Sequence, residues 1–478
     1  MGRVEIPFAG SSKQHRSPAI ANQICENWFI EIERDDQGKE MFRSLIGTPG
    51  KTLITNVSNQ SCRALHSTSS KYSKYWGVFG DTIYEFLNND TSTILGKILT
   101  DQGRVYIADN GTHLLIVDGT NKGYSYDIGA GVLTTITDVN FVGGDYVVFM
   151  HGYFIVIQPG TNILHACQAP YGTAPTTWTA GAVFSTALQD AGPLIALGVS
   201  GDLLWAIGDY STALFQDTGN PTGFPFSLIT GVPLNYGIDA KASLAELRGS
   251  LIWSAKTKKG AGFIVQTEGM SLKKISDSSL SYNIGSYASA ADAYADTYIE
   301  EDHGFYQITF PTGNKTWVFD VITNEWHSRS SSGLGRDRAF GHIFFLGRHI
   351  VGDHTNGNLY ECSLDVYTEN GQPLISKRRC QHLKSAKNQL EIPELIIDME
   401  TGVGIAGDVQ GSDPQAELRY SIDGGKTWSD PLLASMGRIG DYKAELRYPR
   451  LGQSDDWVFE LMVSDPVKRN LVGAYVGS

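Results

Sequence analysis

The sequence predicts an all-β protein in which a β-propeller of about six or seven blades precedes a small C-terminal β-sandwich-like domain. Short segments rich in β-branched and aromatic residues alternate with Gly, Asn and Asp turns, a pattern typical of antiparallel hairpins. The 478 residues include 53 Gly, 22 Tyr and 20 Phe, which favours strands and tight turns over helices. A chain of this length is also too long for one ordinary core, so it requires several domains or one closed repeat architecture.

The expected domains are an N-terminal lead-in arm at 1–60, the propeller at 61–375 and the sandwich-like domain at 376–478. The lead-in arm looks irregular, with one expected strand at 28–33 and a turn at 47–50. Its polar residues either complete turns and strand edges or belong to an arm that docks on a neighbouring molecule.

The hairpin pattern begins after the lead-in and is clearest at 304–362, where GFYQITF and TWVFDVITNEWHSR flank the turn PTGN. One blade cannot bury both of its faces alone, so consecutive sheets must pack side by side around a ring. Helices are expected at only two short Ala-rich stretches, 239–247 and 289–297.

Charge and cysteine content exclude several classes of protein. Lys and Arg number 38 and Asp and Glu number 51, so the net charge is −13, which argues against broad binding of nucleic acid. The five cysteines are widely spaced without a CxxC motif, so we expect reduced thiols and neither a disulfide framework nor a zinc ribbon. The start of the chain lacks the apolar core of a signal peptide, and the apolar run at 146–157 is too short to cross a bilayer.

Three stretches contain residue types that are used in binding or catalysis. The stretch 402–407 matches GxGxxG, but the following DVQGSDPQ disfavours the helix that a dinucleotide site requires, so we expect a loop and no cofactor. His342, His349, Asp353 and His354 could suggest a metal site, but they straddle a predicted strand, and histidines on a blade surface are the simpler interpretation. The carboxylates at 300–302 are expected to be solvated in a turn.

A basic run, SKRRCQHLKSAKNQ at 376–389, marks the boundary between the two predicted domains. Such a run could contact nucleic acid or an acidic partner, or form a solvated linker face, and the second interpretation is the more common one.

A more specific motif is S-x-D-x-G-x-T-W, formed by Ser421, Asp423, Gly425, Thr427 and Trp428. It resembles the Asp-box of sialidases and related propellers. The Asp carboxylate accepts turn amides, Gly permits a positive φ, and Trp packs beneath the hairpin. We therefore predict a structural turn, with no catalytic, cofactor-binding or metal-binding residues in the chain.

Several stretches together resemble the packaged-DNA stabilisation proteins, or tail accessory factors, of short-tailed bacteriophages. The resemblance is most specific from residue 398 onward, including AELRYSIDGGKTWSD and DWVFELMVSDPVKRNLVGAYV, and it extends to ANQICENWFIEIE, TWVFDVITNEWHSR and VGDHTNGNLYECSLDVYTENG.

The resemblance implies a non-enzymatic virion protein of the tail hub or nozzle, made in the host cytoplasm. It would close the head below the portal and its adaptor, retain packaged DNA and form part of the ejection channel. The implied partners are further copies of the chain in a ring of six, the head-to-tail adaptor, a tail needle or tailspike, and double-stranded DNA that passes through the lumen. No cofactor and no membrane insertion are implied. The alternative is a propeller-type glycan hydrolase or lectin that acts on host surface sugars, which the Asp-box keeps open.

Overall fold

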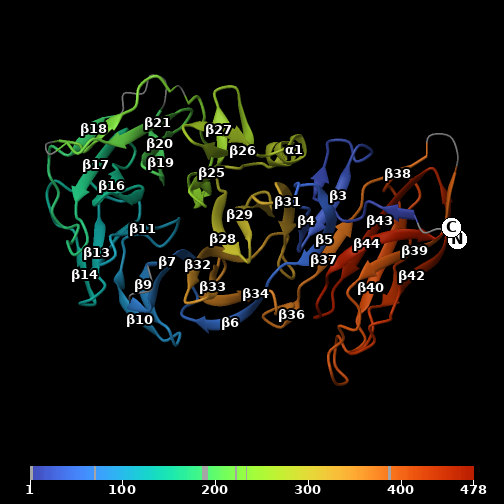
Figure 1. Ribbon diagram of the computed structural model, residues 1–478. Helices are drawn as coiled ribbons and strands as arrows, with labels where there is room; N and C mark the ends of the chain where they lie inside the picture. Colours follow the sequence, from blue (N-terminus) through green and yellow to red (C-terminus); the bar gives the residue numbers. More distant parts are fainter. Residues whose placement is uncertain are drawn as a thin grey trace.

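A computed structural model describes residues 4–68, 72–185, 192–220, 223–232, 234–385 and 389–477. Figure 1 shows a ring of small sheets joined on one side to a two-layered β domain. The structure is built almost entirely from strands, with one α-helix in the described residues, α1 (Ser278–Ser286), and a short 3₁₀ helix, η2 (Lys241–Ser243). The all-β prediction is therefore confirmed.

Each of the first five blades is one antiparallel sheet in the described part of the chain. Blade 1 comprises β7 (Cys62–Ser67), β8 (Lys74–Phe79), β9 (Thr82–Leu87) and β10 (Ser92–Lys97). Blade 2 comprises β11 (Tyr106–Asp109), β12 (His113–Val117), β13 (Gly123–Asp127) and β14 (Val132–Thr135). Blade 3 comprises β15 (Val147–Met150), β16 (Tyr153–Ile157), β17 (Ile163–Gln168) and β18 (Val183–Ser185). Blade 4 comprises β19 (Leu194–Ser200), β20 (Leu203–Gly208), β21 (Thr212–Asp217) and β22 (Phe226–Leu228). Blade 5 comprises β23 (Gly237–Ile238), β24 (Ala245–Leu247), β25 (Ser250–Thr257), β26 (Gly260–Glu268) and β27 (Ser271–Lys274).

Blades 6 and 7 belong to larger sheets that include N-terminal strands. Blade 6 comprises β28 (Tyr294–Glu300), β29 (His303–Phe310), β30 (Lys315–Asp320) and β31 (Glu325–Arg329). Blade 7 comprises β32 (Ala339–Phe345), β33 (Arg348–Asp353), β34 (Asn358–Ser363) and β6 (Gly50–Asn56), followed by β35 (Thr368–Glu369) and β36 (Gln372–Pro373). The described chain thus forms a seven-bladed propeller, within the predicted range of six or seven.

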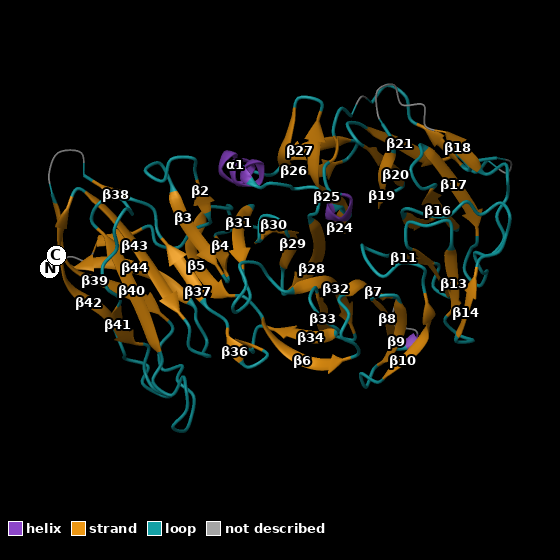
Figure 2. Ribbon diagram, turned by 180° about the vertical axis from the view of Figure 1, so that it is seen from behind, coloured by secondary structure: helices purple, strands orange, loops and turns teal. Residues whose placement is uncertain are grey.

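The second domain is a sandwich of two sheets to which the N-terminal segment also contributes. One sheet contains β4 (Trp28–Arg34), β5 (Glu40–Gly47), β44 (Leu471–Gly477), β39 (Leu390–Met399), β42 (Leu446–Ser454) and β1 (Val4–Ile6). The other contains β3 (Asn22–Glu26), β37 (Ser376–Arg379), β43 (Asp456–Val463), β40 (Gln415–Ser421), β41 (Leu432–Ser435), β2 (Lys13–Gln14) and β38 (Leu383–Lys384). Seen from behind in Figure 2, both chain ends lie at the side of the sandwich that is remote from the propeller.

Apolar side chains fill the spaces between neighbouring blades. Blades 1 and 2 bury Trp76 and Leu114 together, while Trp205 of blade 4 meets Trp253 of blade 5 edge to face, with ring centroids 6.3 Å apart. Each blade therefore buries a second face only because it has a neighbour, which is the physical reason for closing the ring.

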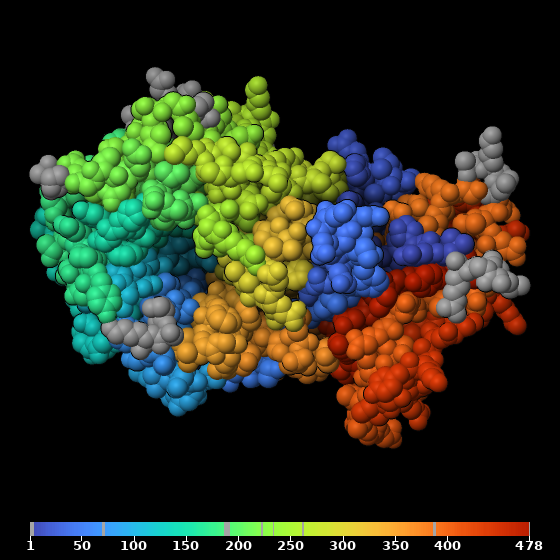
Figure 3. Space-filling view, in the orientation of Figure 1, coloured from blue at the N-terminus to red at the C-terminus, as the bar shows by residue number. Residues whose placement is uncertain are grey.

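Two details of the predicted secondary structure are wrong. The stretches expected to be helices instead form η2, β24 and part of β28, because inner propeller positions bury their small and apolar residues in strands. The supposedly irregular lead-in contains β1 to β6, including the expected strand as β4, and joins both domains. In Figure 3 a large part of this segment, in blue, lies between blade 6 and the sandwich.

Candidate functional site: ring closure and the junction with the sandwich

The propeller is closed by a strand from the opposite end of the domain. β6 pairs antiparallel with β34 as the outer strand of blade 7, with Gly50 opposite Ser363 and Asn56 opposite Asn358. Gly50 must be glycine here, because a Cβ atom would lie 2.3 Å from the backbone oxygen of Val366. Separation of β6 from β34 would open the ring.

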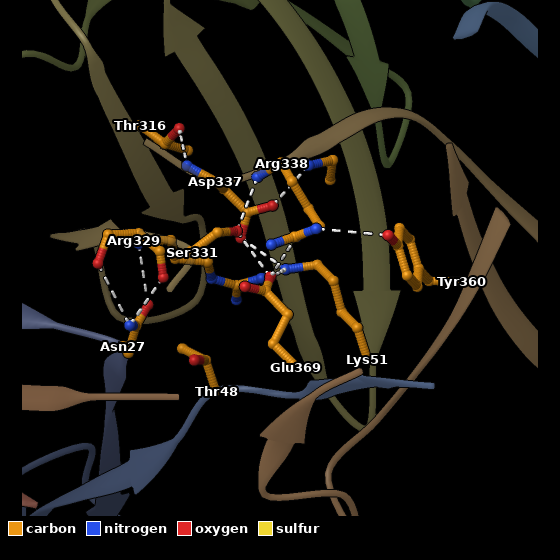
Figure 4. Close-up of polar contacts among 12 residues, drawn as sticks. Asn27, Thr48, Lys51, Thr316, Arg329, Ser331, Asp337, Arg338, Tyr360 and Glu369 are labelled. Carbon is orange, nitrogen blue, oxygen red and sulfur yellow. Dashed lines mark hydrogen bonds and ion pairs between the residues drawn. The ribbon is translucent and has the colours of Figure 1, made fainter. Parts of the chain in front are cut away.

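A buried charge cluster holds this closing strand in place (Figure 4). The ammonium of Lys51, on β6, lies 2.8 Å from Asp337 Oδ2 and 2.9 Å from Glu369 Oε1, and all three side chains are buried. Burial disfavours a charged ammonium, but the two carboxylates outweigh this effect and raise the pKa of Lys51. Lys51 therefore stays charged and joins β6 to both the start of blade 7 and β35.

The carboxylates of the cluster have further partners. Glu369 accepts hydrogen bonds from the Ser331 hydroxyl at 2.6 Å and the Ser332 amide at 3.0 Å, and its carboxylate is 3.3 Å from Arg338 Nε. The Asp337 carboxylate accepts from the Ala339 amide at 2.8 Å, in addition to its contact with Lys51. Because the lone pairs are satisfied, the buried charges form a connected network that fixes the geometry of the closure.

The junction between the two domains is a shared sheet. β3 pairs parallel with β31 of blade 6 on one side and antiparallel with β37 of the sandwich on the other. The residue after β3, Asn27, donates from Nδ2 to the carbonyls of Ser330 at 3.0 Å and Ile375 at 2.7 Å. Hydrogen bonding therefore continues from blade 6 into the sandwich, with the N-terminal segment as the connecting piece.

Aromatic and charged side chains reinforce the junction. Trp28 is fully buried and donates from Nε1 to the carbonyl of Arg469 at 2.6 Å. His303 of blade 6 lies between two carboxylates, with Nδ1 2.7 Å from Asp320 and Nε2 2.9 Å from Glu31 on β4. Burial by itself lowers the pKa of His303, but the hydrogen bonds to both carboxylates outweigh it and raise the pKa to about 9.

This histidine predicts a pH dependence of stability at alkaline pH. A histidine whose pKa is 6.5 when unfolded and about 9 when folded stabilises the protein fully below 6.5, and this contribution is lost as the pH rises through 9. We expect the melting temperature of the wild type to fall between neutral pH and about pH 9.5, and to fall less in His303→Gln. Equal slopes in both proteins, measured by thermal unfolding across this pH range, would contradict the assignment.

Several described residues of the basic run make contacts within the protein. Arg378 is fully buried and donates to the backbone carbonyls of Phe8, Ser11 and Ile24. Arg379 is paired with Glu460 at 2.6 Å. The run therefore attaches the N-terminal segment to the sandwich, although its residues 386–388 lie outside the described part.

The S-x-D-x-G-x-T-W motif forms a hydrogen-bonded turn at the end of β40. Asp423 Oδ1 accepts from the amides of Lys426 at 2.9 Å and Thr427 at 2.8 Å, and its Oδ2 accepts from the Thr427 hydroxyl at 2.7 Å. Ser421 donates its hydroxyl to Asp423 at 2.7 Å, and Gly425 has a φ of +87°. These bonds hold the pKa of the Asp423 carboxyl well below its usual range.

Trp428, the last residue of the motif, is flanked by two guanidinium groups. Arg379 lies 4.8 Å and Arg419 5.7 Å from the ring centroid. The indole therefore stacks with cations on the sheet and is only half-buried, rather than fully covered by the hairpin.

His342 and His349 were expected on a blade surface, but they lie at the contact between blades 6 and 7. His342 Nε2 and His349 Nδ1 are 2.9 Å apart, and the His342 ring stacks on Tyr298 at 4.5 Å, so both are half-buried between blades 6 and 7. Burial lowers the pKa of both and keeps them neutral. Asp353 is fully buried and accepts from the Tyr360 hydroxyl at 3.1 Å. Across the described residues, no three His, Cys, Asp or Glu side chains are arranged to hold a metal ion.

The two other candidate stretches are the GxGxxG stretch at 402–407 and the carboxylates at 300–302. The GxGxxG stretch is a loop that packs against a neighbouring loop, with the Gly404 amide donating to the Gly437 carbonyl at 3.3 Å. Glu301 and Asp302 are exposed in the β28–β29 turn as predicted, but Glu300 is half-buried. All five cysteines are free thiols.

The propeller also has a pocket of about 330 Å³ whose lining includes arginines and carboxylates, the residue types that a glycan hydrolase would use. Arg63 donates to the carbonyls of Gly80, Thr100 and Gln102, and Arg104 is paired with Asp296 at 3.0 Å. Two of the three arginines that line the pocket therefore already have partners within the protein.

The sequence does not predict the closing cluster. Lys51, Asp337 and Glu369 are far apart in the chain, and each looks like an ordinary surface charge. The only local signal is the position of Lys51 directly after the predicted turn at 47–50, where a strand can begin.

Family models match both domains. The model described as bacteriophage P22 Gp10, β-propeller, matches residues 4–367, and the model described as bacteriophage P22 Gp10, β-sandwich, matches residues 377–477. A search of curated proteins found no match.

Solved structures with similar folds include the WD40 propeller domain of Doa1 (TM-score 0.41, 12% identity, 66% of this chain and 97% of that one). Virginiamycin B lyase from Staphylococcus aureus has a TM-score of 0.43 at 12% identity, over 66% of this chain and 98% of that one. YCF48 bound to D1 peptide has a TM-score of 0.39 at 10% identity, over 69% and 99%. In the described residues, no helix is long and apolar enough to cross a membrane.

Proposed function

The chain belongs to the bacteriophage P22 Gp10 family of phage stabilisation proteins, and from this premise we propose that it closes the DNA-filled head as a hub or nozzle of a short tail. It is a structural protein of a phage virion. The observation that carries the proposal is the match of the two family models to nearly the whole chain, one for each domain. In the proposed role the protein sits below the portal and its adaptor, and the genome leaves through a channel that it helps to form.

The described contacts support a component that bears load. Packaged DNA presses outward, so a closure must not open between its domains or between its blades. The shared sheet through β3 opposes the first kind of opening, and the Lys51 cluster on β6 opposes the second. Both features belong to a rigid building block rather than to a hinged one.

The charge of the chain supports passage of DNA without binding. With a net charge of −13, the protein would release few counterions from the DNA phosphates on contact. DNA would therefore pass along the channel wall without binding to it. We propose that several copies, six by family resemblance, form a ring through two different matching faces on each copy. A needle or tailspike would attach on the side remote from the head.

Removal of the gene from the parent phage tests this function. We expect heads to fill and then lose their DNA, seen as empty particles by electron microscopy and as loss of nuclease-protected DNA. Supply of the wild-type chain from a plasmid should restore full heads. Full heads on particles that fail to adsorb would contradict the proposal and would favour binding or cleavage of host surface sugars instead.

A further inference from the structure

A small cavity lies beside the closing cluster, between blades 6 and 7. Its volume is about 20 Å³, which exceeds the roughly 10–15 Å³ that a single water molecule requires. It is lined by residues of β28 and β31 from blade 6, by β32 from blade 7, and by Pro49 and Lys51 at the start of the closing strand. Whatever fills it contacts both blades and the start of the closing strand.

Arg329, at the end of β31, supplies unused hydrogen-bond donors to this cavity. Its side chain is 7% exposed, and Nη1 makes one long bond of 3.3 Å to Gln307 Oε1. Within the described chain, Nε and Nη2 have no hydrogen-bond partner. Figure 4 shows Arg329 next to the Lys51 cluster. The free N–H groups on Nε and Nη2 point the same way, so this side of the buried guanidinium can donate two hydrogen bonds to one acceptor.

A third unused donor belongs to Tyr298. The described residues offer no acceptor for its buried hydroxyl, which lines the same cavity close to the Arg329 guanidinium, and its ring lies under that guanidinium at 5.4 Å. Buried polar atoms without partners are rare in native proteins and usually indicate a bound water or ion. Here the unused groups of Arg329 are all donors, so the occupant has to be an acceptor.

The carboxylates that line the cavity have other partners, apart from one. Asp296 is paired with Arg104 at 3.0 Å and accepts from the Gly341 amide, and Asp337 is paired with Lys51. Glu300 is the exception. Burial raises its pKa to about 7, although Arg329 opposes this rise, so Glu300 is easily neutralised and is a weak counter-charge.

We propose that this cavity binds one small monovalent anion of the halide type, which is chloride under ordinary conditions. The Nε–Nη2 edge of Arg329 and the hydroxyl of Tyr298 donate to it. Water is the poorer occupant because it carries no charge to offset the buried guanidinium. Polyatomic anions such as phosphate are excluded by the volume. The site goes beyond the proposed tail function, because its role is to stabilise the ring closure itself.

Bromide provides a direct test with the full-length chain. Crystals grown with sodium bromide in place of chloride should show an anomalous peak in the cavity, next to Nε and Nη2 of Arg329. A peak that refines as water and has no anomalous signal would overturn the proposal. This experiment requires no variant, so it does not depend on whether a substituted chain folds.

Thermal unfolding tests the energetic role. At equal ionic strength, the melting temperature should be higher by about 2 °C or more in sodium chloride than in sodium gluconate, whose anion is too large to enter. Tyr298→Phe removes a donor and should reduce this difference by half or more. Glu300→Gln removes a like charge and should enlarge it. An identical chloride effect in the wild type and both variants would show a non-specific salt effect and would overturn the proposal.

Discussion

Replacement of Lys51 by methionine is expected to destabilise the propeller by about 3–5 kcal/mol, the largest effect that we anticipate from a single substitution. The substitution leaves Asp337 and Glu369 buried without the cation that now lies within 2.9 Å of both. It also releases the closing strand, because Lys51 is the residue of β6 that holds these carboxylates. Denaturant unfolding followed by tryptophan fluorescence measures the loss, since buried Trp76 and Trp253 lie between the blades.

Two companion variants show whether burial of charge is the cause. Lys97→Met removes an exposed ion pair with Asp81 and should cost no more than about 1 kcal/mol. The double variant Lys51→Met/Asp337→Asn neutralises one stranded carboxylate and should recover part of the stability lost in Lys51→Met. If Lys51→Met were as stable as Lys97→Met, the cluster would not be what holds the ring closed.

The sequence allows prediction of the parts of this fold that depend on neighbouring residues. The hairpin of β29 and β30 follows from PTGN between two β-rich segments, and Asn314 adopts a φ of +47° there, with its amide bonded to the Pro311 carbonyl. The closure by β6 depends instead on partners about three hundred residues away in the chain, and a single sequence contains no local signal for such a pairing. The same limit explains the wrong helices, because only the ring makes Ala245–Leu247 an inner strand.

Candidate functional residues can likewise be predicted from the sequence only where their contacts are with neighbouring residues in the chain. The turn around Asp423 can be predicted because its donors and acceptors lie within four residues of one another. The buried roles of Lys51 and His303 could not be predicted, because their environment is created by β35 and β4, which are distant in sequence. The role of the basic run cannot be read from its own sequence for a related reason. Whether Arg378 faces solvent or backbone carbonyls depends on where residues 8–24 pack.

Arg378→Met is expected to detach the N-terminal segment from the sandwich. The guanidinium donates to the carbonyls of Phe8 at 2.6 Å, Ser11 at 3.1 Å and Ile24 at 3.0 Å, and the side chain is fully buried. Each buried carbonyl that loses its donor costs about 1–3 kcal/mol, so we expect a total loss of about 3 kcal/mol or more. Limited proteolysis should then cut the first twenty residues, and hydrogen exchange should increase along β1 and β3.

The neighbouring lysine provides the control that separates a structural from a nucleic-acid role for this run. Lys377 precedes Arg378 on β37 and is half-buried, so Lys377→Met should leave proteolysis and stability close to those of the wild type. Binding to double-stranded DNA at low salt should be weak and equal in the wild type and both variants, since an acidic chain offers little counterion release. A basic patch that binds DNA would give the opposite result, with affinity reduced in both variants and the N-terminal segment still protected. That outcome would mean that the wall of the proposed channel binds its DNA rather than letting it slide.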